Sequence, residues 1–419
     1  MLRILFLLAL LTAGFAPAAV HADAAGTRML RYPDLHGDQL VFSYAGDLWL
    51  APLDDSAPAR RLTSHPGLEL YPRFSPDGSR IAFTGQYRGD EQVYVIDTAG
   101  GAPRQLTFYP TEGPLPARWG TDHQVYGWSA DGEHVLFRST RHSAPDARLF
   151  QVPAAGGLPV PLPMPRAGSG DFSPDGGQLL YSPLFRDFRT WKRYQGGWAQ
   201  DLYVFDLARH TVEPVAPSVR TERDPMWIGD AVYFVSDRTG TLNLHRCDLA
   251  TKQVEPLTHS TTWDVRWASS DNRGRIVYEL DGELEVYDTA ARQARRLAIH
   301  VPDDGLNRRP SRYPVAKWIE GFELSPKGER ALFVARGDVF TAPIEKGATR
   351  NLTNSSGAHE KHARWSPDGR RVAYVSDRTG EEQLWLEDQD GGGAPEPLTT
   401  AFRAQLMAPA WSPDGRRIA

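Results

Sequence analysis

A short motif, Ser-Pro-Asp-Gly or a close variant of it, recurs along the chain and constrains the fold more than any other feature. Clear copies are RFSPDGSRIAF, GWSADGEHVLF, DFSPDGGQLLY, ELSPKGERALF, RWSPDGRRVAY and the closing AWSPDGRRIA. Proline suits the second position of a tight turn, and glycine suits the position that needs a positive φ. Because apolar residues flank each turn, every copy predicts a β-hairpin.

Nine such repeats, three of them weaker, begin roughly 40 to 57 residues apart, which is close to the spacing of four-stranded propeller blades. Their first residues are Leu35, Phe74, Trp128, Phe172, Trp227, Trp267, Leu324, Trp365 and Trp411. Each turn is followed by a second alternating strand and by an ending such as ARRLT or VEPLT. A single four-stranded sheet cannot cover its own apolar faces, whereas radial packing of successive sheets buries them.

The repeats therefore predict an all-β protein with two domains. Residues 23–300 are expected to form a six-bladed β-propeller of four-stranded antiparallel blades, and residues 318–419 the first, incomplete part of a second β-propeller. Residues 301–317 lack strand alternation and are rich in turn-forming residues, which indicates an interdomain linker. Because the last repeat stops inside a blade, we expect the chain to be the N-terminal part of a longer protein.

The N-terminus has the pattern of an export signal. Arg3 precedes the apolar run 4–11, and residues 20–22 form a small-x-small cleavage pattern. Thr, Gly and Pro interrupt the apolar stretch, which argues against a permanent membrane span. We expect residues 1–22 to be a signal peptide that directs the protein out of the cytoplasm, to the periplasm, and no later segment predicts a membrane span.

Composition narrows the possible functions. The formal net charge of −5 argues against a general nucleic-acid binder, whose surface would be basic. A single cysteine, Cys247, excludes an intrachain disulfide or a multi-cysteine metal site, and its strand-like context favours a buried apolar role. His359 and His362 have the spacing of a metal pair, but they lie just before a blade strand. The sequence predicts no cofactor and no metal.

Two motifs that resemble functional sites are better explained by the repeat. Gly127-Trp128-Ser129-Ala130-Asp131 lacks the last glycine of a nucleophile elbow, so Ser129 is assigned to the structural turn. The hexapeptide VSDRTG occurs at both 235–240 and 375–380, and identical loops in separate blades indicate repeat architecture.

Two segments stand outside the repeat. The first, at 185–205, reads FRDFRTWKRYQGGWAQDLYVF and predicts an insertion in the fourth blade, with cations stacked over Trp191, Tyr194 and Trp198. Both ligand contact and self-packing remain open for it. The second, at 110–122, reads PTEGPLPARWGTD and places Arg118 where it could pair with a carboxylate, although a solvated arginine is the alternative.

Several of these stretches resemble the tricorn proteases, across residues 28–419. They are RYPDLHGDQLVFSYAGDLWLAPL, RFSPDGSRIAFTGQY and especially FRTWKRYQGGWAQDLYVFDL. The resemblance implies a large serine peptidase that degrades oligopeptides, in which a six-bladed propeller precedes a seven-bladed one and catalytic regions flank a PDZ-like module. It also implies six subunits in a ring. The family's catalytic residues belong to its C-terminal half, so the resemblance names no catalytic residue in this chain.

The resemblance also suggests a role for one residue. In the family the propellers act as filters and passages for peptides, and a basic pair from a first-propeller loop anchors the substrate's terminal carboxylate. The matching context here, PLPARWGTD, offers Arg118 followed by Trp119, so only Arg118 is carried over as substrate-binding. The export signal is a departure, because the archetypal members work in the cytosol.

Two other functions remain open at this point. One is a non-catalytic periplasmic propeller that binds a protein partner, like the Tol-system propeller with its similar repeats. The other is the propeller of a prolyl oligopeptidase-like enzyme, which would be followed by a G-x-S-x-G elbow within an α/β-hydrolase region.

Overall fold

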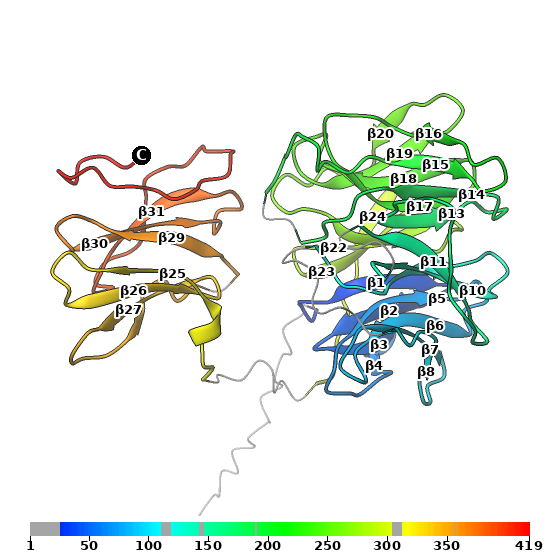
Figure 1. Ribbon diagram of the computed structural model, residues 1–419, viewed down its shortest axis with the longest axis horizontal. Helices are drawn as coiled ribbons and strands as arrows, with labels where there is room; N and C mark the ends of the chain where they lie inside the picture. Colours follow the sequence, from blue (N-terminus) through cyan, green and yellow to red (C-terminus); the bar gives the residue numbers. More distant parts are fainter. Residues whose placement is uncertain (1–25, 110–118, 142–145, 189–190, 304–311, 356) are drawn as a thin grey trace, which may run out of the picture.

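The computed structural model describes residues 26–109, 119–141, 146–188, 191–303, 312–355 and 357–419 (Figure 1). Within these ranges the chain forms eight four-stranded antiparallel sheets, in each of which strands adjacent in sequence are paired. One short 3-10 helix, η2 (Ala316–Trp318), precedes the seventh sheet. The protein is therefore all-β, as the sequence predicts.

The strands of the first three sheets are β1 (Arg31–His36), β2 (Gln39–Tyr44), β3 (Asp47–Pro52) and β4 (Arg60–Arg61); β5 (Glu69–Phe74), β6 (Arg80–Gly85), β7 (Gln92–Asp97) and β8 (Arg104–Gln105); and β9 (Gln124–Trp128), β10 (His134–Ser139), β11 (Arg148–Pro153) and β12 (Val160–Pro161). Those of the next three are β13 (Ser169–Phe172), β14 (Gln178–Ser182), β15 (Tyr203–Asp206) and β16 (Val212–Pro214); β17 (Glu222–Ile228), β18 (Ala231–Ser236), β19 (Asn243–Asp248) and β20 (Val254–Pro256); and β21 (Arg266–Ser270), β22 (Arg275–Leu280), β23 (Glu283–Asp288) and β24 (Gln293–Arg296). The last two sheets contain β25 (Ile319–Leu324), β26 (Arg330–Ala335), β27 (Asp338–Pro343) and β28 (Arg350–Asn351); and β29 (Glu360–Trp365), β30 (Arg371–Ser376), β31 (Gln383–Asp388) and β32 (Glu396–Pro397).

The repeated motif forms the turn between the first two strands of a sheet. In the second sheet the Ser75 hydroxyl donates to Oδ1 of Asp77 at 2.5 Å and accepts from the amide of Arg80 at 3.0 Å. Gly78 has φ +73°, a conformation that glycine adopts without steric cost. These contacts lie within six residues, which is why the motif alone predicts the hairpin.

A separate apolar layer fills each space between neighbouring sheets of the first six. Phe74 and Phe83 face the first sheet, Trp128 packs between the second and third, and Trp227 lies between the fourth and fifth. These side chains expose 8% or less of their surface. Their burial supports the expectation that the motif aromatics fill layers between sheets, because such large side chains carry most of the hydrophobic gain.

The sixth sheet packs back onto the first. Strand β1 lies against both β21 and β22, and the innermost strands of the six sheets contact one another in sequence order. The N-terminal segment completes this junction, since the Thr27 amide donates to the Ile299 carbonyl at 2.7 Å and the Val301 amide to the Thr27 hydroxyl at 2.9 Å. The six sheets therefore surround one axis, the arrangement of a β-propeller, and are called the first unit below.

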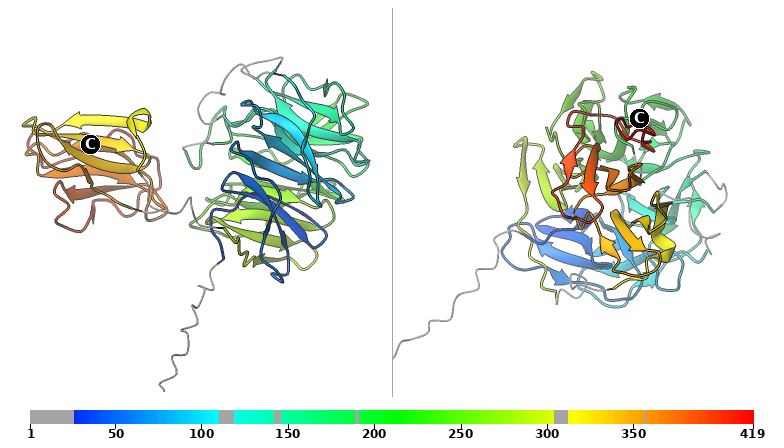
Figure 2. Two further views of the ribbon diagram at one scale, coloured as in Figure 1. Left: turned by 90° about the horizontal axis from the view of Figure 1, so that it is seen from below. Right: turned by 90° about the vertical axis from the view of Figure 1, so that its left-hand side faces the viewer.

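Sheets β25–β28 and β29–β32 form a second body beside the first, called the second unit (Figures 1 and 2). Its two sheets share one core that includes Leu332, Val339 and Trp365. One face of β25 is uncovered, with Phe322 77% and Leu324 62% exposed. Near the last residue, Trp411 and Ile418 form an isolated antiparallel bridge.

One expectation about the repeat is wrong. The sequence predicts Trp267 as the motif aromatic of the sixth sheet, but Ser270 pairs with Ile276 where Phe74 pairs with Ile81 in the second sheet. Trp267 thus lies three residues before the motif position.

Within the described part of the chain, no helix combines the length and apolarity that a membrane crossing requires.

Candidate functional site: the axial cavity

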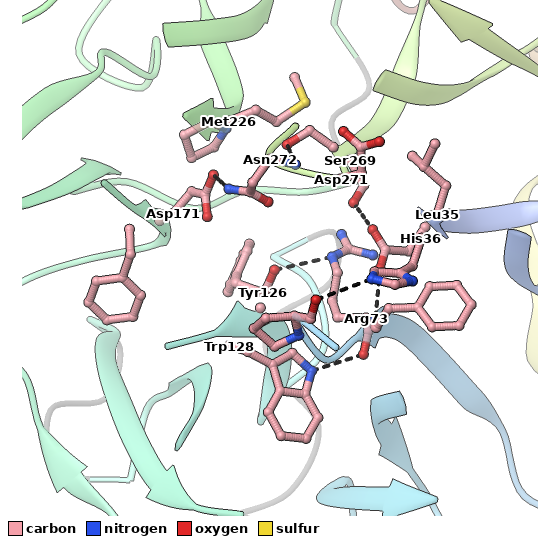
Figure 3. A pocket seen from close by; sticks show the side chains of 18 of the residues that line it. Leu35, His36, Arg73, Tyr126, Trp128, Asp171, Met226, Ser269, Asp271 and Asn272 are labelled. Carbon is pink, nitrogen blue, oxygen red and sulfur yellow. Dashed lines mark hydrogen bonds between the residues drawn. The ribbon is translucent and has the colours of Figure 1, made fainter. Parts of the chain in front are cut away.

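A cavity of about 270 Å³ lies on the axis of the first unit, where the innermost strands meet (Figure 3). All six innermost strands, β1, β5, β9, β13, β17 and β21, contribute residues to its wall. The turn residues Pro76 and Pro174 extend the lining beyond the strand ends. Because every sheet contributes, this cavity is built by the whole first unit.

Two carboxylates in the wall link neighbouring sheets. Asp34 Oδ2 accepts a hydrogen bond from the Phe74 amide at 2.7 Å, and Asp171 Oδ2 accepts one from the Trp227 amide at 2.7 Å. Burial raises the pKa of each carboxyl to about 6. The same link occurs in the second unit, where Glu323 Oε2 accepts from the Trp365 amide at 2.8 Å. These acids therefore have a structural role that recurs around both units.

Arg73 brings a positive charge to the same wall. Its Nε donates to the Tyr126 carbonyl at 3.1 Å and its Nη1 to the Pro72 carbonyl at 2.8 Å. In turn, the Trp128 indole donates to the Arg73 carbonyl at 3.0 Å. The wall thus combines fixed carboxylates, a guanidinium held by main-chain oxygens and apolar groups such as Met226, a mixture suited to polar main-chain ligands.

Three aromatic residues lie close together near the axis, and one of them, Trp267, lines this cavity. Tyr32, Tyr71 and Trp267 have φ values of +53°, +54° and +51°, at positions where the strand register shifts. Such left-handed backbone costs a residue other than glycine about 1–2 kcal/mol. The ring of Tyr32 lies 4.4 Å from that of Tyr71 and 4.8 Å from that of Trp267, and all three are buried.

A fourth aromatic side chain, from a connection between strands, packs against one of these three. Phe188, in the connection between β14 and β15, lies 5.7 Å from the Trp267 ring, and the guanidinium of Arg223 is 5.1 Å from the same ring. We call Tyr32, Tyr71, Trp267 and Phe188 the axial aromatic cluster. Trp267 belongs both to this cluster and to the cavity wall, so the cluster touches the cavity through this residue.

A buried ion pair joins the third and fourth sheets at the same end. Arg138 on β10 is completely buried, and its Nη2 donates to Asp187 Oδ2 at 2.9 Å. Asp187 immediately precedes Phe188, and its own carbonyl accepts from Arg223 Nη1 at 3.4 Å. Sheets one, two and six contribute rings here, the fourth-sheet connection contributes the Phe188 ring and Asp187, and sheets three and five contribute arginines, so all six sheets meet at this cluster.

The substrate-binding residue expected from sequence, Arg118, lies outside the described residues. Its neighbour Trp119 is described, and it contacts the fourth-sheet insertion: its ring lies 5.4 Å from those of both Phe185 and Trp198. The Asp187 amide donates to the Trp119 carbonyl at 3.3 Å. The two segments that stand outside the repeat are therefore packed against each other.

The expected cation–aromatic stacking in the insertion is present at Trp191 and Trp198, whereas Tyr194 contacts another ring. Arg186 lies 4.3 Å from the Trp191 ring and 5.9 Å from the Trp198 ring, and Trp191 lies 5.1 Å from Tyr194. Much of the insertion is therefore self-packed, which was one of the two interpretations that the sequence left open.

The other candidate residues from the sequence lie in strands, turns or buried layers. His362 is in strand β29, and among the residues with described coordinates no three His, Cys, Asp or Glu side chains gather as a metal site. The Ser129 hydroxyl donates to Asp131 Oδ1 at 2.5 Å inside its turn. Cys247 is buried in the layer between sheets four and five, and burial raises its thiol pKa.

Sequence reasoning missed the axial aromatic cluster. One signal was available, because Tyr32-Pro33, Tyr71-Pro72 and Asp224-Pro225 repeat an X-Pro pair three residues before the motif position. Asp224 shares the positive φ of the two tyrosines, at +51°. Trp267 lacks the proline, so the pattern by itself would have found only part of the cluster.

Comparison with known proteins shows similarity to the tricorn proteases. A family model described as the tricorn protease N-terminal beta propeller domain matches residues 27–293. Two tricorn protease homologs of Streptomyces coelicolor are each 30% identical to this chain, over 88% and 86% of it and 32% and 33% of their own lengths. The tricorn protease homolog of Saccharolobus solfataricus is 27% identical over 86% of this chain and 32% of its own length.

A solved structure supports the fold. The crystal structure of the tricorn protease superposes with a TM-score of 0.60 at 20% identity, covering 93% of this chain and 41% of that one. The fold and its axial cavity thus define a protein of the β-propeller class. The chain belongs to the tricorn protease family, and it spans about a third of the length of the curated relatives it matches.

Proposed function

We propose that this chain is the propeller part of a tricorn-like serine peptidase that degrades oligopeptides, and that its propellers gate and guide peptides toward an active site elsewhere in the full-length protein. The observation that carries the proposal is the axial cavity, to which all six innermost strands contribute. Family membership supplies the peptidase class. No residue of this chain is proposed to be catalytic, and no cofactor is invoked.

We also propose the domain organisation. Residues 1–22 are a signal peptide, residues 23–300 a six-bladed propeller, residues 301–317 a linker and residues 318–419 the first blades of a second propeller. The packing of β1 against β21 supports a ring of six. The uncovered face of β25 supports a second ring with further blades, because an exposed apolar sheet face of this kind requires a partner.

The axial cavity can be tested directly as the peptide route. Gly127 lines it, and a Cβ atom added there would have no heavy atom within 4 Å. Gly127→Cys in the full-length protein should therefore fold, and its thiol can be modified with a small methylthio group or a bulky fluorescein maleimide. We expect oligopeptide hydrolysis to slow only with the bulky label. Equal rates with both labels would exclude passage through this cavity.

Arg118 is proposed to assist by pairing with the terminal carboxylate of the peptide. Arg118→Ala in the full-length enzyme should raise KM for peptides with free C-termini and leave amidated peptides unaffected. The same change in KM for both kinds of peptide would assign Arg118 a structural role instead.

The setting of the enzyme is proposed from the same sources. We propose peptides as its substrates, a periplasmic location on the basis of the predicted signal peptide, and a hexamer on the basis of the family resemblance. Cell fractionation and native mass determination test these two points. The alternative, a partner-binding propeller without catalysis, is less supported, because the similarity to a TolB homolog of Chlorobium luteolum covers 16% of this chain.

A further inference from the structure

A pair of basic residues in the fourth-sheet insertion reaches from the first unit to the second. Arg193 Nη1 donates to Glu381 Oε1 at 2.9 Å, and its Nη2 donates to Glu381 Oε2 at 2.8 Å. This is the parallel, bidentate geometry that makes arginine–carboxylate pairs strong and directional. Glu381 lies in the connection between β30 and β31 in the eighth sheet, 188 residues away along the chain.

Two further bonds attach the same residues to the second unit. Lys192 Nζ donates to the Gly380 carbonyl at 3.0 Å, and Arg193 Nη2 donates to the Arg403 carbonyl at 2.8 Å. Gly380 has φ +90°, a conformation that turns its segment tightly at the contact. The contact therefore recognises main-chain oxygens as well as one carboxylate.

Arg193 is also held from the side of the first unit. Its carbonyl accepts from Arg220 Nη1 at 2.8 Å, and its Nη1 lies 3.4 Å from the Gly240 carbonyl. The rings of Trp191 and Tyr194, on either side of the pair, lie 5.1 Å apart. Because the side chain is already ordered by its own unit, less entropy is lost when it binds Glu381.

The pair is partly shielded from water. The side chains of Arg193 and Glu381 expose 20% and 30% of their surfaces. The hydrogen bonds between the two side chains lower the pKa of the Glu381 carboxyl. The same bonds raise the pKa of the Arg193 guanidinium. Such shielding makes the pair stronger than a fully exposed one, whose contribution is near zero.

Both copies of the repeated hexapeptide VSDRTG contact the insertion. Gly240 and Gly380 are the last residues of the two VSDRTG copies, one in each unit. Arg193 contacts the first copy at Gly240, and Lys192 contacts the second at Gly380. The insertion thus sits between two similar turns that present similarly placed carbonyl oxygens.

We propose that Lys192 and Arg193 form an inter-unit clamp that binds Glu381 and the 375–380 turn and so sets the orientation of the second unit relative to the first. The clamp borders a cavity of about 550 Å³ whose wall includes Asp264 of the first unit and His362 of the second. The width of this space therefore depends on the clamp. The proposal does not rest on the peptidase assignment, because it concerns the geometry of this chain alone.

The experiment is a charge swap read out as a distance. Spin labels at Leu158→Cys, which is 85% exposed in the first unit, and Lys346→Cys, exposed in the second, report the separation of the units by double electron–electron resonance. Native Cys247 is fully buried and stays unlabelled. The variants are Arg193→Glu, Glu381→Arg and the double swap, with Arg209→Glu as the matched control.

Arg209 suits the control because its ion pair with Asp206 stays within the fourth sheet. We expect each single reversal to lower the ratio of docked to undocked chains by roughly tenfold, which corresponds to about 1.4 kcal/mol. The double swap should restore a narrow distance distribution, and the control should leave it unchanged. Narrow, unshifted distributions in both single variants would overturn the proposal.

A folding defect is separated from loss of the clamp by a second measurement. Urea unfolding of each variant, followed by tryptophan fluorescence, should match that of the unmodified chain, because the clamp residues lie outside both cores. If a single variant unfolds early, Lys192→Ala supplies the test, since it removes the bond to Gly380 and the attraction to Glu381 without reversing a charge. A distribution unchanged by Lys192→Ala would then count against the clamp.

Discussion

Arg138 is the largest side chain that the described residues bury completely, and its replacement tests how the axial end of the first unit is stabilised. Its Nη1 donates to the Tyr126 hydroxyl at 2.9 Å and to the Gly168 carbonyl at 3.1 Å. Its Nη2 donates to the Thr121 carbonyl at 3.0 Å, to Gln124 Oε1 at 2.8 Å and to Asp187 Oδ2 at 2.9 Å. Arg138→Met keeps most of the volume and removes all of these donors.

The expected loss follows from the carboxylate that remains. Asp187 has only 6% of its side chain exposed, so without Arg138 its charge stays buried and loses the guanidinium that is hydrogen-bonded to it. Breaking one side of a buried ion pair costs about 3–5 kcal/mol, which in a unit of this size lowers Tm by roughly 5–15 °C. Asp187→Leu combined with Arg138→Met should recover part of the loss, because the unpaired charge is then absent.

The assay is equilibrium urea unfolding followed by tryptophan fluorescence, with the m-value checked for each variant. Arg209→Met serves as the control, since Arg209 is 80% exposed and should change stability by less than about 0.5 kcal/mol. The reasoning is refuted if Arg138→Met loses less than about 1 kcal/mol. It is also refuted if the double variant is no more stable than the single one.

Three further predictions concern other parts of the fold. Gly78→Ala should destabilise the protein more than Gly176→Ala. The two φ values are +73° and +72°, but only a Cβ at position 78 would meet the His36 ring, at 2.3 Å. Equal urea midpoints for the two variants would contradict this prediction. Burial raises the pKa of Asp34 to about 6 in the folded state, so its stabilising contribution is complete below about pH 4 and is lost as pH rises to about 6. Asp34→Asn should therefore flatten the decline of the urea midpoint across that interval, and an unchanged slope would argue against the burial assignment. Cys247 should react with a thiol reagent only after urea is added, since the native thiol is buried and its pKa is raised; rapid native labelling would show that the layer opens.

Much of the fold could be predicted from sequence because its signals are local. The turn around Ser75 and Gly78 is built from hydrogen bonds between residues at most five apart, so the motif alone identifies it. Spacing between motifs then predicts the sheets, and the aromatic residues at Phe74 and Trp227 do lie in the layers between them.

The candidate site was less predictable, because its parts come together only when the ring closes. Tyr32 and Trp267 are 235 residues apart, yet their rings lie 4.8 Å from each other since the first sheet packs on the sixth. Arg138 looks like an ordinary strand residue in LFRST, and nothing nearby in sequence indicates that Asp187 pairs with it.

The sequence by itself determined the hairpins, their number and the alternation of buried and exposed faces, since turn chemistry and strand periodicity operate over a few residues. Long-range packing settles which residues meet, namely the aromatic rings on the axis, the Arg138–Asp187 pair and the contact of Arg193 with Glu381. Each of these joins residues from different sheets, and their separation in space depends on how the sheets pack rather than on any local pattern.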